Sequence, residues 1–212
     1  MTKYGKITAW LVAVWFVAAL SASGLHLFAN GSNRFGLGVA VAALAPMIVF
    51  SLSFAASEGF RSFALSLNPR TLTSVQVWRI IGFTFVVLEA RNVLPAIFAL
   101  PAGYGDMFIG ATAGFAAWKL AEPVHRGSFI FWQALGILDL VTAVSLGTTA
   151  SLFAPHGPSM MAMTVLPLSL IPTFFVPLFT MLHVICVAQA RKWESASQDG
   201  QRVTRPLQHS AI

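Results

Sequence analysis

The 212-residue sequence carries very little charge. Asp, Glu, Lys and Arg make up 9% of it, whereas hydrophobic residues make up 57%. An average soluble domain has roughly 25% charged residues, so a water-soluble fold could not cover its surface with so few. The same shortage excludes an intrinsically disordered chain and a nucleic-acid-binding protein, because both depend on polarity or charge. We therefore expect an integral membrane protein whose main partner is the lipid bilayer.

Cysteine is almost absent as well. Cys186 is the one cysteine, so an intramolecular disulfide and a cysteine-ligated metal or iron–sulfur site are excluded within one chain. The sequence also lacks a P-loop, a GxSxG or HExxH motif and a dinucleotide-binding fingerprint. These absences favour a function other than catalysis.

Apolar stretches of about 20 residues, the length needed to cross a bilayer, make up most of the chain. There are six candidates: Ile7 to Ala29, Phe35 to Ser57, Thr73 to between Asn92 and Leu100, Gly105 to Ala121, Ser128 to Gly147, and Met163 to Ala190. Their connections are short. We therefore predict an all-α polytopic membrane helix bundle of about six transmembrane helices over residues 1–191. The polar tail, residues 192–212, is expected to be disordered or to lie on the membrane surface.

The basic residues predict the orientation of these spans. Six spans place most of them on one side: Lys3, Lys6, Arg61, Arg70, Lys119, Arg126, Arg191, Lys192, Arg202 and Arg205. Arg34 is the clear loop cation of the opposite side. Because cytoplasmic loops are rich in Lys and Arg, both termini are predicted to be cytoplasmic. A cleaved signal peptide ending near Gly24 is the alternative for the start, but the apolar run continues beyond that point.

Local motifs add details to this map. Residues Thr73–Gln76 have the pattern of a capping box and predict the start of the third span. Pro167, Pro172 and Pro177 predict a bent helix in the sixth span, with a gating hinge as the alternative. Gly110–Gly114 form a GxxxG motif, which predicts close helix packing within the chain or between chains.

Three ionisable residues are expected at similar depth in the inner half of the bundle. A helix rise of about 1.5 Å per residue places Arg79, Asp139 and His183 there. Each needs a partner or a water-filled cavity, and Asp139 is the carboxylate that can pair with Arg79 at that depth. His183 is the group best able to titrate near neutral pH.

A second set of ionisable residues, Glu89, Arg91 and Asp106, is predicted nearer the outer side. Between them, Leu94–Asp106 contains two prolines and two glycines. We expect a broken helix end or a shallow re-entrant turn, with Asp106 as the N-cap of the fourth span. Both sets of charges have a structural alternative, in which ion pairs and caps only hold the helices in register.

Three functions are compatible with these features. The first is a small-solute transporter or channel, with proton coupling through Asp139, with Arg79 as its partner or as an anion anchor, and with Glu89 and Asp106 as an outer gate. The second is a non-catalytic subunit of a larger membrane complex, or a homo-oligomer, for which Gly110–Gly114 and the many aromatic residues would provide interfaces.

The third function is a membrane redox or metal-binding protein. Its candidate ligands are His26 and His156 at the outer surface, together with His183. No tight histidine spacing supports a metal site, and no cofactor is predicted. A haem with one histidine and one methionine ligand stays open, because the chain has seven methionines.

Several segments of the sequence resemble a group of small six-span bacterial inner-membrane proteins without a known activity. The segments are Val77–Phe83, Leu94–Asp106, Leu135–Val141 and Pro167–Pro177 with His183. The resemblance covers roughly Thr73 to Arg191. It implies a multi-pass protein of the bacterial cytoplasmic membrane and no particular activity.

Overall fold

The computed structural model describes residues 3–29, 37–153 and 158–203. Across these ranges the structure is helical and contains no strand, so the prediction of an all-α fold is confirmed. The elements are α1 (Lys3–Gly24), α2 (Leu37–Ala56), α3 (Glu58–Ser66), α4 (Pro69–Ser74), η1 (Val75–Gly82), α5 (Phe83–Ala90), α6 (Ala96–Phe115), η2 (Ala116–Leu120), η3 (Pro123–His125), α7 (Arg126–Phe153), η4 (Met160–Thr164), η5 (Ile171–Phe175) and α8 (Val176–Val203). The elements η2 and η5 are π-helical, and η1, η3 and η4 are 3₁₀-helical.

Five helical segments in the described part of the chain are long and apolar enough to cross a membrane. They are Lys3–Gly24, Gly38–Ala56, Pro69–Ala90, Pro123–Ser151 and Ile171–Trp193. The predicted fourth span corresponds to α6, which packs against η1, α5 and α7 inside the bundle. Its 20 residues are enough to cross a bilayer, although it is not one of these five apolar segments.

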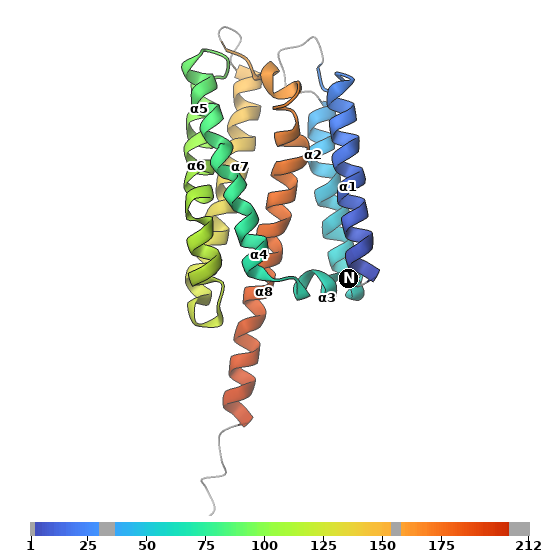
Figure 1. The fold of residues 1–212 in the computed structure, drawn as a ribbon, viewed down its shortest axis with the longest axis vertical. Coiled ribbons are helices and arrows are strands. Elements are labelled where there is room, and N and C mark those ends of the chain that lie inside the picture. Colours follow the sequence, from blue (N-terminus) through green and yellow to red (C-terminus); the bar gives the residue numbers. More distant parts are fainter. Residues whose placement is uncertain (1–2, 30–36, 154–157, 204–212) are drawn as a thin grey trace, which may run out of the picture.

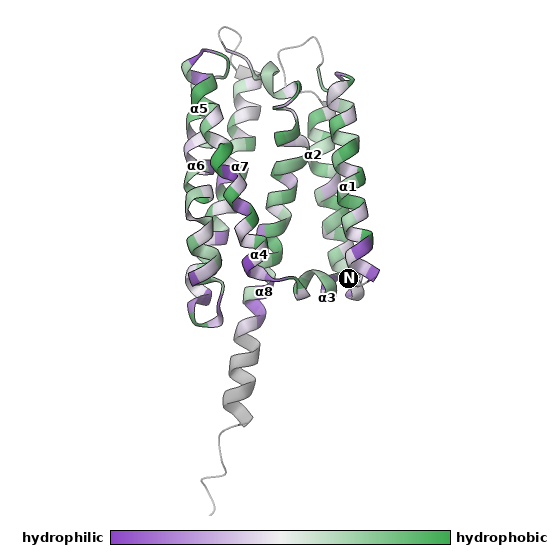
Figure 2. Ribbon diagram, in the orientation of Figure 1, coloured by the Kyte–Doolittle hydropathy of each residue, from purple (hydrophilic) through white to green (hydrophobic). Residues whose placement is uncertain are grey.

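The helices form two groups on either side of α8. Figure 1 shows α4 to α7 on one side of α8 and the pair α1 and α2 on the other. The start of α1 and the far end of α8 lie at the same end of the bundle, as the six-span prediction requires. Hydrophobic residues cover most of the helix surfaces, and hydrophilic residues gather toward the ends and at a few positions inside the bundle (Figure 2). A helix that is apolar all round suits a lipid environment.

The third span begins earlier than predicted. Asn68 is the N-cap of α4, and its Oδ1 accepts a hydrogen bond from the Arg70 backbone N–H at 2.9 Å. Pro69 follows at the first helical position, where its missing N–H costs nothing. The prediction of a capping box over Thr73–Gln76 was therefore wrong, and Thr73 and Gln76 are instead buried inside the bundle.

The predicted re-entrant turn between Leu94 and Asp106 was also wrong. Pro95 is the N-cap of α6, and the helix runs through Pro101. The glycines suggested a turn, but they permit close contacts instead: a Cβ on Gly103 would press on Val86 and on the Gly82 carbonyl of the facing span. Asp106 consequently lies in the middle of a helix and caps nothing.

The sixth span differs from the single bent helix that was predicted. Continuous helix starts near Ile171, where η5 forms a π-helical turn that leads into α8, and a 3₁₀ turn precedes it at Met160–Thr164. Pro177 lacks the N–H that would bond to the Thr173 carbonyl, which favours a widened turn at this point. At the other end, α8 continues to Val203, beyond Ala190, where the predicted sixth span ends. Residues 204–212 lie outside the described residues.

Candidate functional site

A straight stripe of buried residues runs along the third span at every third position. Thr73, Gln76, Arg79, Gly82 and Phe85 are buried, and most residues between them are exposed. The stripe is straight because η1 is a 3₁₀-helix of eight residues, in which residues i and i+3 eclipse each other. This geometry places Gln76, Arg79 and Gly82 on the same side of η1, the side that faces into the bundle.

Arg79 is the centre of a charge cluster, which we define as Arg79, Asp106, Asp139 and His183. Its Nε donates to Asp106 Oδ1 at 2.7 Å, and its Nη2 donates to Asp139 Oδ2. Its Nη1 contacts His183 Nε2 at 3.2 Å and the Gly136 carbonyl at 3.3 Å. These contacts use at least four of the five guanidinium N–H groups, and they connect η1 to α6, α7 and α8.

His183 continues the cluster as a neutral ring with a defined tautomer. A guanidinium can only donate hydrogen bonds, so His183 Nε2 accepts from Arg79 and Nδ1–H donates to Gln133 Oε1. The Gln133 amide then donates to Thr73 Oγ1 at 3.0 Å, and that hydroxyl contacts Cys186 Sγ at 3.8 Å. Because both ring nitrogens are engaged, His183 is poorly placed to ligate a metal or a haem iron.

Glycines make the room that the cluster needs. A Cβ on Gly105 would overlap the carboxylate of Asp139, and a Cβ on Gly136 would overlap the ring of His183. In the GxxxG motif, a Cβ on Gly110 would overlap the backbone of Ile80, whereas one on Gly114 would meet nothing within 4 Å. The motif therefore provides close packing within the chain at Gly110.

The structure brings together four of the six predicted site residues. Three of them were expected to meet, and the fourth was expected elsewhere. Arg79, Asp139 and His183 meet, and Asp106 joins them, so its prediction as part of an outer gate was wrong. The cause is the early start of α6 at Ala96, which puts Asp106 ten residues into the helix.

The remaining predicted site residues lie away from the cluster. Glu89 is the penultimate residue of α5, and Arg91 follows that helix and is exposed. Neither forms an ion pair with another described residue. His26 is exposed just after α1, and His156 lies outside the described residues. In the ranges that the structure covers, no three His, Cys, Asp or Glu side chains are grouped so that they could hold a metal ion.

Sequence reasoning missed two members of the polar network, Gln133 and Thr73. A signal for Thr73 was present, because Thr73, Gln76 and Arg79 are polar residues at a spacing of three within one apolar span. In a 3₁₀-helix that spacing puts all three residues in line on one face. In an α-helix the three residues would instead drift across about 120° of the surface.

A cavity of about 340 Å³ lies beside the charge cluster, between the third span and the segment that leads into α8. Arg79 and Asp106 are its ionisable lining residues, and apolar and aromatic side chains form most of its wall. The two groups are not equally accessible: the Asp106 side chain is 16% exposed and that of Arg79 is 1% exposed. The charge that reaches this cavity is therefore a carboxylate.

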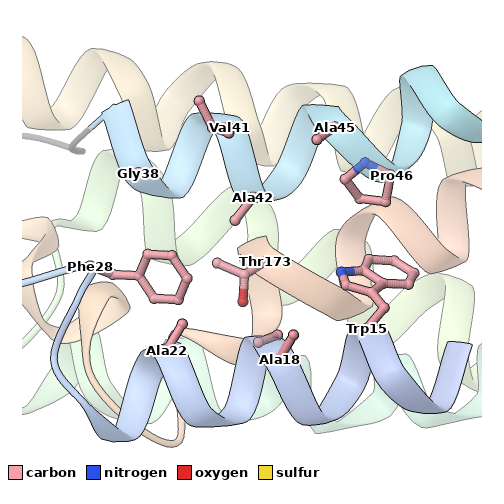
Figure 3. Close-up of a pocket in the computed structure, with 11 residues that line it drawn as sticks. Trp15, Ala18, Ala22, Phe28, Gly38, Val41, Ala42, Ala45, Pro46 and Thr173 are labelled. Carbon is pink, nitrogen blue, oxygen red and sulfur yellow. The ribbon is translucent and has the colours of Figure 1, made fainter. Parts of the chain in front are cut away.

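A second cavity, of about 540 Å³, lies between α1, α2 and η5. Figure 3 shows its small residues, among them Ala18, Ala22 and Ala42, with Trp15 and Phe28 toward its two ends. Thr173 faces it, but the Thr173 hydroxyl already donates to the Ser169 carbonyl at 2.7 Å. With no ionisable residue in its lining, this cavity suits apolar material such as lipid chains.

Comparison with known proteins identifies a family. A family model described as a domain of unknown function (DUF8737) matches residues 34–191. No curated protein and no solved structure matches the chain. The matched range begins after α1 and contains the whole charge cluster and the cavity beside it.

Proposed function

The chain belongs to the family described as a domain of unknown function (DUF8737), a membership that names no activity, and we propose from the site itself that it is a proton-coupled transporter of small solutes. The observation that carries the proposal is the charge balance of the cluster. One guanidinium faces two carboxylates, Asp106 and Asp139, and the geometry of His183 makes it neutral. With both carboxylates ionised, the cluster keeps one negative charge.

An unbalanced charge inside a bilayer is costly. A single proton or a single bound cation removes it, so the cluster is suited to exchange protons as the surroundings change. Intramembrane carboxylates in such positions characterise proton relays and transport pathways. A purely structural ion pair would need one carboxylate rather than two.

The contacts also favour one of the two roles considered for Arg79. An anion anchor has to present free N–H groups to its ligand, but Arg79 is 1% exposed and its donors are occupied by Asp106, Asp139, Gly136 and His183. Arg79 is therefore the partner of the carboxylates. Because Asp106 and Asp139 are 16% and 14% exposed, they are the groups from which protons can enter and leave.

Polar side chains continue from the cluster toward the end of the bundle where α4 begins. His183, Gln133 and Thr73 form a hydrogen-bonded series through apolar surroundings. Gln76 lies one turn of η1 before Arg79, and its buried Oε1 has no hydrogen-bond partner among the described residues. This series extends the polar interior from the cluster toward that end, as far as the buried Thr73.

Proton binding at the cluster is directly measurable. In purified protein reconstituted into lipid, infrared pH titration is expected to show a protonated carboxyl band that disappears as the pH rises. Asp106→Asn or Asp139→Asn should remove or shift this band, because each substitution leaves one carboxylate balanced by Arg79. Glu122→Gln is the control, since Glu122 pairs with Arg70 on the surface. Absence of a titrating intramembrane carboxyl would overturn the proposal.

Coupling to a solute is the second part of the test. Vesicles with an imposed pH gradient are supplied with solutes of different charge, and the gradient is followed with an internal pH-sensitive dye. At least one class of solute should dissipate the pH gradient in vesicles that contain the wild-type protein. In vesicles that contain Asp139→Asn, the same solute should dissipate the gradient at least tenfold more slowly. Equal dissipation by the two proteins would contradict a role for Asp139.

We further propose a bacterial cytoplasmic membrane as the location, with the end that holds the start of α1 on the cytoplasmic side. Lys119 is exposed near one end of α6 and Val93 is exposed before its other end. Lys119→Cys should be protected in intact cells from an impermeant maleimide, and Val93→Cys should react. Cys186 is buried and adds little background. The reverse pattern of labelling would invert the orientation.

A further inference from the structure

The cavity of about 340 Å³ beside the charge cluster has the features of a binding site for one class of solute. Its volume falls in the range of roughly 300–1,000 Å³ that small-molecule sites occupy. Aromatic side chains contribute much of its lining: Trp78, Phe85, Phe175 and Phe179. Such a wall accommodates an apolar body, and aromatic faces also attract cations.

The charge that a ligand would meet in this cavity is negative. Asp106 lines it with a partly exposed carboxylate, whereas Arg79 is enclosed by its own acceptors. Asp139, the other carboxylate that Arg79 contacts, is absent from the cavity lining. A ligand anion would face Asp106 without a free cationic group to hold it.

The position of the cavity indicates how a ligand reaches it. Trp78 and Ile81, on the third span, are 67% and 47% exposed, and Pro167 on the opposite wall is exposed as well. These residues belong to surfaces that face lipid, so the cavity opens sideways between η1 and the segment before α8. A ligand that enters from the hydrocarbon region has to be amphiphilic.

We propose that this cavity binds a hydrophobic ammonium ion, with Asp106 as its counter-ion. The inference rests on the proposed function and names its substrate class. The cluster needs one positive charge for balance, which either a proton or the ammonium group supplies. Binding of the ammonium ion therefore displaces the proton from the carboxylate pair, and the protein exchanges the two across the membrane.

A series of ligands that differ only in charge tests the proposal on the wild-type protein. The probes are 3-phenylpropylamine, 3-phenylpropanol and 3-phenylpropanoate, measured by equilibrium binding to protein in lipid nanodiscs, with empty nanodiscs correcting for partition. The amine is expected to bind saturably and at least tenfold more tightly than the other two. Its affinity should fall as the pH is lowered, because protons compete for the same carboxylates while the amine stays charged.

Each alternative outcome is distinct. Equal binding of the amine and the alcohol would show an apolar site that takes lipid chains, and tighter binding of the acid would show an anion site. Either result overturns the ammonium proposal. If the infrared titration nevertheless detects proton binding at the cluster, the proposed proton coupling survives and only the substrate class is wrong.

Two variants test the counter-ion. Asp106→Asn should weaken binding of the amine at least tenfold and leave binding of the alcohol unchanged. Glu122→Gln, which removes a carboxylate outside the cavity, should bind the amine as the wild type does. Full amine binding by Asp106→Asn would overturn the assignment of the counter-ion. If Asp106→Asn does not fold, the ligand series and the pH dependence of the wild-type protein still decide the proposal.

Discussion

Arg79→Leu is expected to be among the most destabilising single substitutions in this protein. It would leave Asp106 and Asp139, both largely enclosed in the bundle, without their cation and His183 without a donor at Nε2. Removing one partner of a buried ion pair costs about 3–5 kcal/mol. The thermal unfolding midpoint of the detergent-solubilised variant, followed by circular dichroism, should fall well below that of the wild type.

A compensating variant separates charge balance from packing. Adding Asp106→Asn and Asp139→Asn to Arg79→Leu removes the uncompensated carboxylates, so we expect most of the lost thermal stability to return. Because the triple variant has neither carboxyl group, it should lack the titrating carboxyl band. An Arg79→Leu protein that melts like the wild type would contradict the ion pairs at the centre of the cluster.

Arg79→Lys should not restore the wild-type behaviour. The Arg79 side chain serves Asp106, Asp139, the Gly136 carbonyl and His183 at once through a planar fork. A lysine ammonium has three donors on a single nitrogen, so it cannot reach all four acceptors. We expect intermediate stability and an altered proton titration.

The second large effect is expected at Gly105. In Gly105→Ala the new methyl group would overlap the Asp139 carboxylate, and so either Asp139 leaves Arg79 or α6 moves away from α7. Overpacking of this kind typically costs about 1–3 kcal/mol, to which the loss of the ion pair adds. Both the thermal midpoint and the carboxyl band should change.

Gly114→Ala is the matched control on the same helix. A methyl group on Gly114 would have no neighbour within 4 Å, and alanine favours a helix over glycine by about 1 kcal/mol. We therefore expect unchanged or slightly raised thermal stability and an unchanged carboxyl titration. If Gly105→Ala and Gly114→Ala behave alike, the close contact between Gly105 and Asp139 is wrong.

The sequence by itself determined the class of protein and the approximate depth of Arg79, Asp139 and His183. A charged fraction of 9% leaves no alternative to a membrane-embedded helical chain, and the helix rise converts sequence position into depth. That conversion placed Arg79, Asp139 and His183 together correctly, because an error of a few residues in the start of a span moves a side chain by only a few ångströms along the helix.

Only the tertiary structure decided which further residues join them. The depth of Asp106 in the bundle depends on where α6 begins. The two prolines and two glycines of Leu94–Asp106 indicated a turn there. The glycines instead permit close helix contacts with Val86 and Asp139. Sequence composition cannot separate these two uses of glycine, since both require the absence of a side chain.

The local helix type was likewise settled by packing. Gln76, Arg79 and Gly82 lie in line on one face because η1 adopts 3₁₀ geometry, and no residue in Val75–Gly82 specifies that geometry on its own. Close approach to α6 through Gly82, Gly103 and Gly110 accompanies it. The sequence thus determined the membrane fold and the presence of buried charges, whereas contacts between distant helices decided that one guanidinium faces two carboxylates beside a cavity.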